Sequence, residues 1–145
     1  MIYGPSLQKI PTEAAVNTST GNIWNLISGK TAVLPEDRLP LFCDARDVSK
    51  AHLLALESPE SIGHRFILCG GSFTWQEAAQ FLKEARPDLA DKLPGPNPDA
   101  TPKEQLAKLD TTAARRKLGM ESFLDWKTTL IDTIDDLLNV HAKKW

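Results

Sequence analysis

Short apolar runs alternate with amphipathic segments along the chain. Three of the runs, residues 1–3, 41–45 and 65–69, predict strands, and Gly70 and Gly71 predict a tight turn after the last of them. The segments between them have apolar residues at helical spacing. This alternation is typical of an α/β fold.

Capping residues mark two of the predicted helices. Thr74 and Glu77 have the spacing of a capping box, in which the hydroxyl and the carboxylate each accept from the other residue's backbone N–H. The residues that follow place an apolar stripe on one face up to Pro87, made of Trp75, Ala78, Ala79 and Leu82. A second helix is predicted over residues 18–28 and is closed by Gly29.

A further helix is predicted directly after the strand at residues 41–45. Asp47 is the expected N-cap, with Arg46 as its ion-pair or backbone-binding neighbour. Val48, Ala51, His52 and Ala55 share one face. We therefore expect this helix to be thoroughly buried.

The last third of the chain begins with an exposed loop, because four prolines fall within residues 94–102. Asp110 or Thr111 then caps a short helix that ends at Gly119. Asp125 caps a final helix. Its apolar face is formed by Trp126, Leu130, Ile134, Leu137 and Leu138.

Size and charge narrow the class of protein. The 145 residues, 41% of them hydrophobic, suffice for one core, so residues 1–145 are expected to form a single unit. The formal net charge of −2 provides no basic surface for nucleic acid. Apolar stretches such as residues 51–56 are far shorter than the ~20 residues of a membrane helix. No membrane association is expected, and a cytoplasmic protein is the default.

Cysteine and histidine spacing gives no sign of a metal site. Cys43 and Cys69 lie in apolar surroundings without CxxC spacing, which favours buried free thiols over a disulfide. His52, His64 and His141 are too far apart in sequence for a metal motif, and a structural role is expected for each.

One stretch, residues 44–52 (DARDVSKAH), resembles the D-V-R-D-V-A-x-A-H segment of extended short-chain dehydrogenases. Residues 2–5 (IYGP), 16–19 (VNTS) and 62–66 (IGHRF) match further family motifs in the family order, and so does the closing segment from residue 110 to the last helix. Each match is weak alone, but the ordered set is specific. Within that superfamily, the chain is most similar to the branch of dihydroflavonol, cinnamoyl-CoA and methylglyoxal reductases.

The resemblance implies an α/β fold made of the last strands of an extended Rossmann-type sheet and the mostly helical substrate-binding lobe. It also implies NADP as cofactor and a small-molecule carbonyl compound as substrate. The family's Gly-rich turn and its Tyr-x-x-x-Lys pair have no counterpart, since Tyr3 is followed four residues later by Leu7. Roughly the first half of the family's length is therefore expected to be absent, and no catalytic residue is assigned.

The resemblance suggests a role for four residues. Asn17 and Ser19 match the helix start that lies against the cofactor, where amide and hydroxyl groups suit phosphate contact. They are equally good helix caps, and the sequence leaves the two roles open. Trp24 and Phe42 flank the region from which the family builds its substrate pocket, and are candidate pocket walls.

Two functions remain open. In the first, the chain is the substrate-binding lobe of an NADPH-dependent aldehyde or ketone reductase, inactive alone. In the second, it is a non-catalytic remnant or binding module that packs on another reductase chain or forms a homodimer. Apolar residues uncovered at 51–56 and 66–68 would drive such association.

Overall fold

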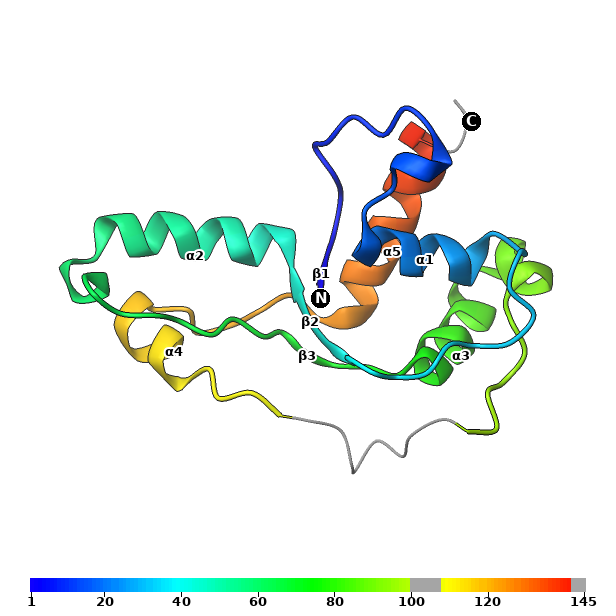
Figure 1. Cartoon of the computed structure of the whole chain (residues 1–145). Helices are drawn as coiled ribbons and strands as arrows, with labels where there is room; N and C mark the ends of the chain where they lie inside the picture. The colour runs from blue at the N-terminus through cyan, green and yellow to red at the C-terminus, as the bar shows by residue number, and fades with distance from the viewer. Residues whose placement is uncertain (100–107, 142–145) are drawn as a thin grey trace.

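The computed structural model describes residues 1–99 and 108–141 and centres on a small mixed sheet (Figure 1). The strands β1 (Ile2–Tyr3), β2 (Leu41–Asp44) and β3 (Gly71–Ser72) lie in the order β1-β2-β3. β1 runs parallel to β2, with Tyr3 opposite Asp44, and β3 runs antiparallel to β2. The predicted strands near residues 1–3 and 41–45 are confirmed.

The predicted strand at residues 65–69 is wrong. The strand that pairs with β2 begins at Gly71, within the predicted turn, and Phe42 lies opposite this glycine. β2 ends at Asp44, where the chain turns into a helix, and no described strand lies beside residues 65–69. An apolar run without a hydrogen-bonding neighbour stays extended but forms no ladder.

The helices form two groups around the sheet. In Figure 1, α1 (Thr18–Ile27), α3 (Trp75–Ala85) and α5 (Trp126–Asp136) lie together on one side, while α2 (Ala45–Glu57) and α4 (Thr112–Leu118) form an arm on the other. Shorter turns complete the chain: η1 (Glu13–Ala15), η2 (Pro59–Ser61), η3 (Pro87–Lys92) and the π-helical η5 (Leu137–His141). Among the described residues, no helix is long and apolar enough to cross a membrane.

The main hydrophobic core lies between the sheet and the group of α1, α3 and α5. Phe42 and Phe73 from the sheet region pack there with Ile23, Leu82 and Leu130 from the three helices. The predicted apolar stripe of α3 and its capping box are both confirmed. The predicted face of the last helix is confirmed too, with Leu130, Ile134 and Leu137 buried and Trp126 and Leu138 packed against them.

The arm differs from the sequence prediction. The N-cap of α2 is Asp44, not Asp47, and Arg46 pairs with Asp44. Only Asp47 and Ala51 of α2 are buried, and His52 is exposed, because α2 packs on α4 along one narrow face. The expectation of a thoroughly buried helix is therefore wrong.

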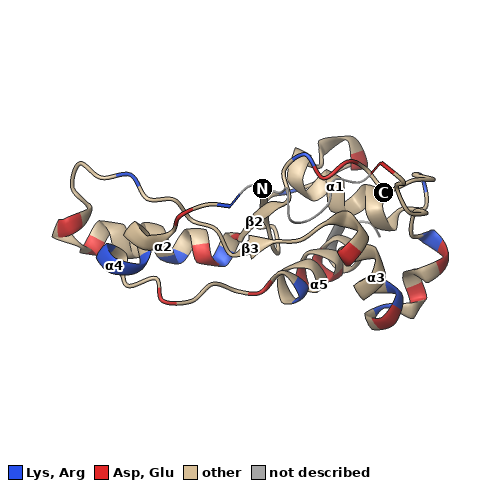
Figure 2. Cartoon of the chain, turned by 90° about the horizontal axis from the view of Figure 1, so that it is seen from below, with Lys and Arg blue, Asp and Glu red and all other residues tan. Residues whose placement is uncertain are grey.

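The last turn of α4, in the arm, is basic. Three basic residues, Arg115, Arg116 and Lys117, fill the last turn of α4 (Figure 2). They lie at the negative end of the helix dipole, where cations are stabilising. Gly119, with φ of 67°, ends the helix in the left-handed conformation, as predicted from the sequence.

Candidate functional site

The carboxyl ends of β1 and β2 lie side by side, because the two strands are parallel. α5 presents a polar face to these strand ends. The N–H of Gly4 donates to Thr133 Oγ1 at 2.8 Å, and the N–H of Ser6 donates to Asp136 Oδ2 at 2.9 Å. α5 therefore fixes the path of the loop that leaves β1.

Asp44 is the centre of a buried polar network at the same edge. Its side chain is fully buried and accepts hydrogen bonds from the backbone and guanidinium of Arg46 and from Thr129 Oγ1. Burial alone would raise the pKa of Asp44, but these hydrogen bonds outweigh burial and hold the pKa below its ordinary value. Arg46 also pairs with Asp132 of α5 at 2.7 Å. Asp44 and Arg46 thus join β2, α2 and α5.

A cavity of about 760 Å³ opens beside this network, and we call it the strand-end cavity. It is bordered by the loop at residues 3–8, the start of α1 and the first three turns of α2. Parallel α/β sheets commonly bind ligands in the crevice outside the carboxyl ends of their strands. Position alone makes this cavity the first candidate for a ligand.

The structure brings Asn17 and Ser19 together on the wall of the strand-end cavity. Asn17 is the N-cap of α1, and its Oδ1 accepts from the N–H of Thr20 at 3.0 Å and from Ser19 Oγ at 2.9 Å. The capping role is thereby confirmed. The cofactor role stays a prediction, and it is compatible with capping because Asn17, Ser19 and Thr20, at the positive end of α1, all line this cavity.

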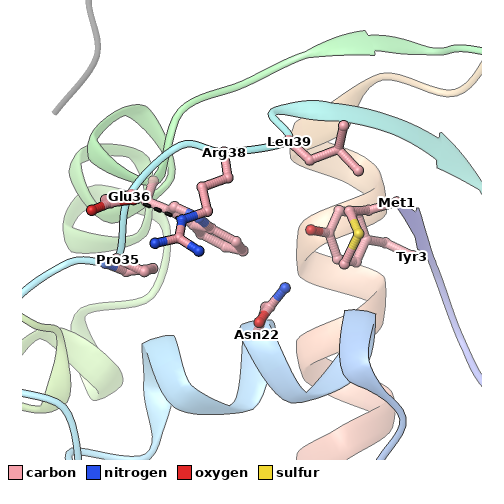
Figure 3. Close-up of a pocket in the computed structure, with 8 residues that line it drawn as sticks. Met1, Tyr3, Asn22, Pro35, Glu36, Arg38 and Leu39 are labelled. Atoms are coloured by element: carbon pink, nitrogen blue, oxygen red, sulfur yellow. Dashed lines mark hydrogen bonds and ion pairs between the residues drawn. The ribbon is translucent and has the colours of Figure 1, made fainter.

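A second cavity, of about 460 Å³, lies on the other side of Tyr3, and we call it the Tyr3 cavity (Figure 3). Apolar groups from three segments line part of it, and Asn22, Glu36 and Arg38 add polar groups. The full lining comprises Met1, Tyr3, Asn22, Pro35, Glu36, Arg38, Leu39 and Trp75. Because Tyr3 also lines the strand-end cavity, the two cavities share one wall.

Tyr3 itself is buried, and burial raises the pKa of its hydroxyl to about 12, although a hydrogen bond with Asn22 partly offsets the rise. A hydroxyl with so high a pKa is a poor proton donor at neutral pH. Tyr3 therefore lies as a wall between the two cavities, and the sequence-based assignment of no catalytic role to it stays a prediction.

Trp24 and Phe42 line neither of these cavities, although Phe42 borders a smaller cavity of about 280 Å³. Trp24 is half-buried and packs against the main core. Phe42 is only 2% exposed and packs on Phe73, with the ring centroids 5.7 Å apart. Their assignment to a substrate pocket stays a prediction. Tyr3, Asn22 and Arg38, which line the Tyr3 cavity, were not assigned from the sequence, since only the fold brings their three segments together.

Within residues 1–99 and 108–141, no group of His, Cys, Asp and Glu could hold a metal ion. Cys43 and Cys69 are free thiols, as predicted, and Cys43 is buried, but Cys69 is only partly buried, so the predicted burial of Cys69 is wrong. Burial raises the pKa of Cys43 to about 11, so its thiol is unreactive at neutral pH.

Comparison with known proteins finds relatives that are oxidoreductases. The chain is 34% identical to an uncharacterised oxidoreductase of Saccharomyces cerevisiae over 98% of its length, and 31% identical to the NADPH-dependent methylglyoxal reductase GRE2 of the same organism. It is 33% identical to the ketoreductase azaE of Aspergillus niger over 95% of its length. The chain spans only about 41% of these relatives, in their C-terminal part. No family model matches the chain.

Solved structures agree with the sequence relatives. The crystal structure of yeast methylglyoxal/isovaleraldehyde reductase Gre2 with NADPH matches 99% of this chain with a TM-score of 0.74 at 31% identity. Gre2 of Candida albicans in complex with NADPH matches 97% of it with a TM-score of 0.72 at 29% identity. In both cases, 42% of the solved chain is covered.

Proposed function

The chain belongs to the short-chain dehydrogenase/reductase-type enzymes, as a C-terminal portion related to the methylglyoxal reductases, and from that premise we propose that it is the substrate-binding lobe of an NADPH-dependent carbonyl reductase. The observation that carries the proposal is the pair of cavities that share Tyr3 at the carboxyl end of β1. One cavity has a helix N-terminus suited to a phosphate, and the other has a largely apolar lining suited to a small organic compound.

The strand-end cavity fits an anionic part of the cofactor. Asn17 and Ser19 lie at the positive end of α1, and Lys50 of α2, which also lines the cavity, adds a cation. Ser19 Oγ already donates to Asn17 Oδ1, so the donors to a phosphate would be the side-chain amide of Asn17 and the backbone N–H groups of the first turn. NADPH, when bound, supplies the hydride, while these residues bind and orient it.

The Tyr3 cavity is the proposed place of the carbonyl substrate. Its apolar residues would exclude water from the substrate, and Asn22 and Arg38 would orient its polar groups. The chain has a single tyrosine, and the raised pKa of Tyr3 makes it unsuited to protonate a carbonyl oxygen. We therefore propose that the proton comes from the part of the enzyme that precedes this lobe in its relatives, and that the lobe is inactive alone.

A chimera tests the proposal directly. The part of yeast GRE2 that precedes the matched region is joined to this chain, and the oxidation of NADPH is followed with methylglyoxal and with larger aldehydes. Carbonyl-dependent oxidation is expected. A chimera that folds and binds NADPH but oxidises none with any carbonyl compound would contradict the proposal.

Within the chimera, Asn17→Asp separates the two roles of Asn17. Aspartate is as good an N-cap as asparagine, so the stability of α1 should be kept. Its negative charge would repel a cofactor phosphate and should raise the Kd for NADPH by about tenfold. The matched control is Asn25→Asp, which adds the same charge on an exposed position further along α1. Equal affinities in the two variants would assign Asn17 to capping alone.

The second function, a binding module, is favoured by one observation. β1 is an edge strand, and Ile2, Leu53 and Leu56 are 50%, 62% and 85% exposed. Exposed strand edges and apolar residues promote association with another chain or with a second copy. Light scattering on the purified chain, compared with Leu53→Glu/Leu56→Glu, tests it. A monomer in both would contradict the binding module.

The cytoplasm is the proposed compartment. Both cysteines are free thiols, as is usual in reducing compartments.

A further inference from the structure

The polar groups of the Tyr3 cavity differ in kind from its apolar lining. Asn22 contributes a side-chain amide, Arg38 contributes a guanidinium, and Glu36 contributes a carboxylate that is already paired with Arg38. In Figure 3, Asn22 rises from α1 and Arg38 comes down from the loop that precedes β2, so that the two side chains approach the same space from opposite walls. Both can donate hydrogen bonds, and a guanidinium carries a permanent positive charge.

Arg38 is only partly engaged by the protein. Its Nε donates to Glu36 Oε2 at 2.7 Å, and its side chain is 84% exposed. The bond to Glu36 raises the pKa of Arg38, which keeps the guanidinium charged. Figure 3 shows the two terminal nitrogens turned away from Glu36 and toward α1. In arginine–carboxylate pairs, two guanidinium nitrogens can each donate one of two parallel hydrogen bonds to the carboxylate.

From this geometry, and resting on the proposed function, we infer that the Tyr3 cavity selects carbonyl compounds that carry a carboxylate next to the ketone, with Arg38 as the specificity-determining residue. The carboxylate meets the terminal nitrogens of Arg38, and the alkyl chain lies against Leu39, Pro35 and Trp75. Asn22 donates to the remaining acceptor. A neutral ketone of the same length would make the apolar contacts but leave the guanidinium without a ligand.

Two ligands of matched carbon skeleton test the inference on the 145-residue chain without NADPH. Binding of 2-oxopentanoate and of 2-pentanone is followed by the NMR shifts of the Asn22 side-chain amide and the Trp75 indole N–H. Because a hydrogen bond to a charged group contributes more than a neutral one, the oxo acid should bind at least about tenfold tighter. Arg38→Gln should abolish this preference, and Arg38→Lys should keep part of it.

Arg115→Gln is the matched control, because it removes the same charge from an exposed position on α4 and should keep the preference. Glu36→Gln removes the competing carboxylate and should strengthen binding of the oxo acid. Equal Kd values for the two ligands, an unchanged preference in Arg38→Gln, or no saturable shift at Asn22 and Trp75 would each overturn the inference. Failure of the proposed function shows differently, as absent NADPH oxidation by the chimera while the Arg38-dependent shifts persist.

Discussion

The hydroxyl of Thr129 donates a 2.8 Å hydrogen bond to the fully buried carboxylate of Asp44. This bond joins α5 to the junction of β2 and α2, 85 residues away in the sequence. A buried carboxylate is costly unless its lone pairs are satisfied, and Arg46 satisfies the others. The contact therefore fixes the edge of the sheet at which the strand-end cavity opens.

Thr129→Val tests this contact. Valine keeps the shape of the side chain but leaves one acceptor of Asp44 without its donor, so the free energy of unfolding should fall by about 1–3 kcal/mol. Chemical denaturation measures the change. Ser49→Ala, which removes an exposed hydroxyl bonded to its own helix, is the control and should have an effect below about 0.5 kcal/mol. Equal losses in the two variants would show that the Thr129 bond adds nothing.

Asp44 also predicts how stability changes in acid. Hydrogen bonds from Arg46 and Thr129 lower the pKa of Asp44 in the folded state below its ordinary value of 3.8. Its contribution is therefore present above pH 3.8 and is lost as the pH falls through the lowered folded-state pKa. Asp44→Asn should be less stable at neutral pH and show a shallower loss in acid. The measurement is urea unfolding as a function of pH, and parallel curves for variant and wild type would refute the assignment.

The pKa of Asp37 is shifted in the opposite direction to that of Asp44. Its buried Oδ1 accepts from the N–H of Trp75, the first residue of α3, at 2.7 Å. Burial, with a smaller effect of Glu77, raises the pKa of Asp37, so the stability that it contributes is lost as the pH rises from 3.8 through the folded-state pKa.

Asp37→Asn keeps the acceptor without the buried charge and should change the stability at neutral pH by less than about 1 kcal/mol. Asp37→Ala leaves the Trp75 N–H without its acceptor and should cost about 1–3 kcal/mol. Thermal denaturation of the two variants at neutral pH gives the comparison. If alanine is tolerated as well as asparagine, the loop before β2 does not depend on this bond.

Local signals allowed the helix starts to be predicted from the sequence. The Thr74–Glu77 capping box and the caps at Asn17 and Asp125 involve residues two or three apart, and the structure contains all of them. The predicted cap of α2 at Asp47 is wrong, since aspartate stands at both positions 44 and 47 and either can cap a helix. Only the fold shows that Asp44 caps the helix, whereas Asp47 accepts from the N–H of Leu124.

Nonlocal arrangement explains what the sequence could not predict. Residues 65–69 have the composition of a strand, but pairing depends on which segment lies alongside. The Tyr3 cavity likewise draws Tyr3 from β1, Asn22 from α1 and Arg38 from a loop. No spacing in the sequence relates these three residues. By contrast, the cap at Asn17 was predictable from the sequence because it is local, whereas the cofactor role of Asn17 and Ser19 rests on the family resemblance and stays a prediction.

Tyr3→Phe tests whether Tyr3 only lines the two cavities or also acts as a catalytic acid. Phenylalanine keeps the buried ring, which packs on Phe73 with centroids 5.9 Å apart, and removes only the hydroxyl that meets Asn22. In the chimera with GRE2, kcat should stay within about threefold, whereas loss of a general acid costs about 10²–10⁴-fold. Steady-state kinetics with methylglyoxal decide between them. A loss of that size would make Tyr3 a proton donor despite its high pKa.

Substitution by alanine should have opposite effects on stability at Gly70 and at Gly21. A Cβ at Gly70 would lie 3.0 Å from Phe42 Cζ and 3.2 Å from the carbonyl oxygen of Leu124. Gly70→Ala should therefore lower the free energy of unfolding by about 1–3 kcal/mol, because the buried Phe42 ring has to move.

Gly21 lies within α1, and a Cβ there would meet only Val16 Cγ1, at 3.9 Å. Gly21→Ala should stabilise the protein by about 0.5–1 kcal/mol through the higher helix propensity of alanine. Denaturation midpoints of the two variants measure the difference, and a neutral Gly70→Ala would show that the sheet tolerates displacement of Phe42.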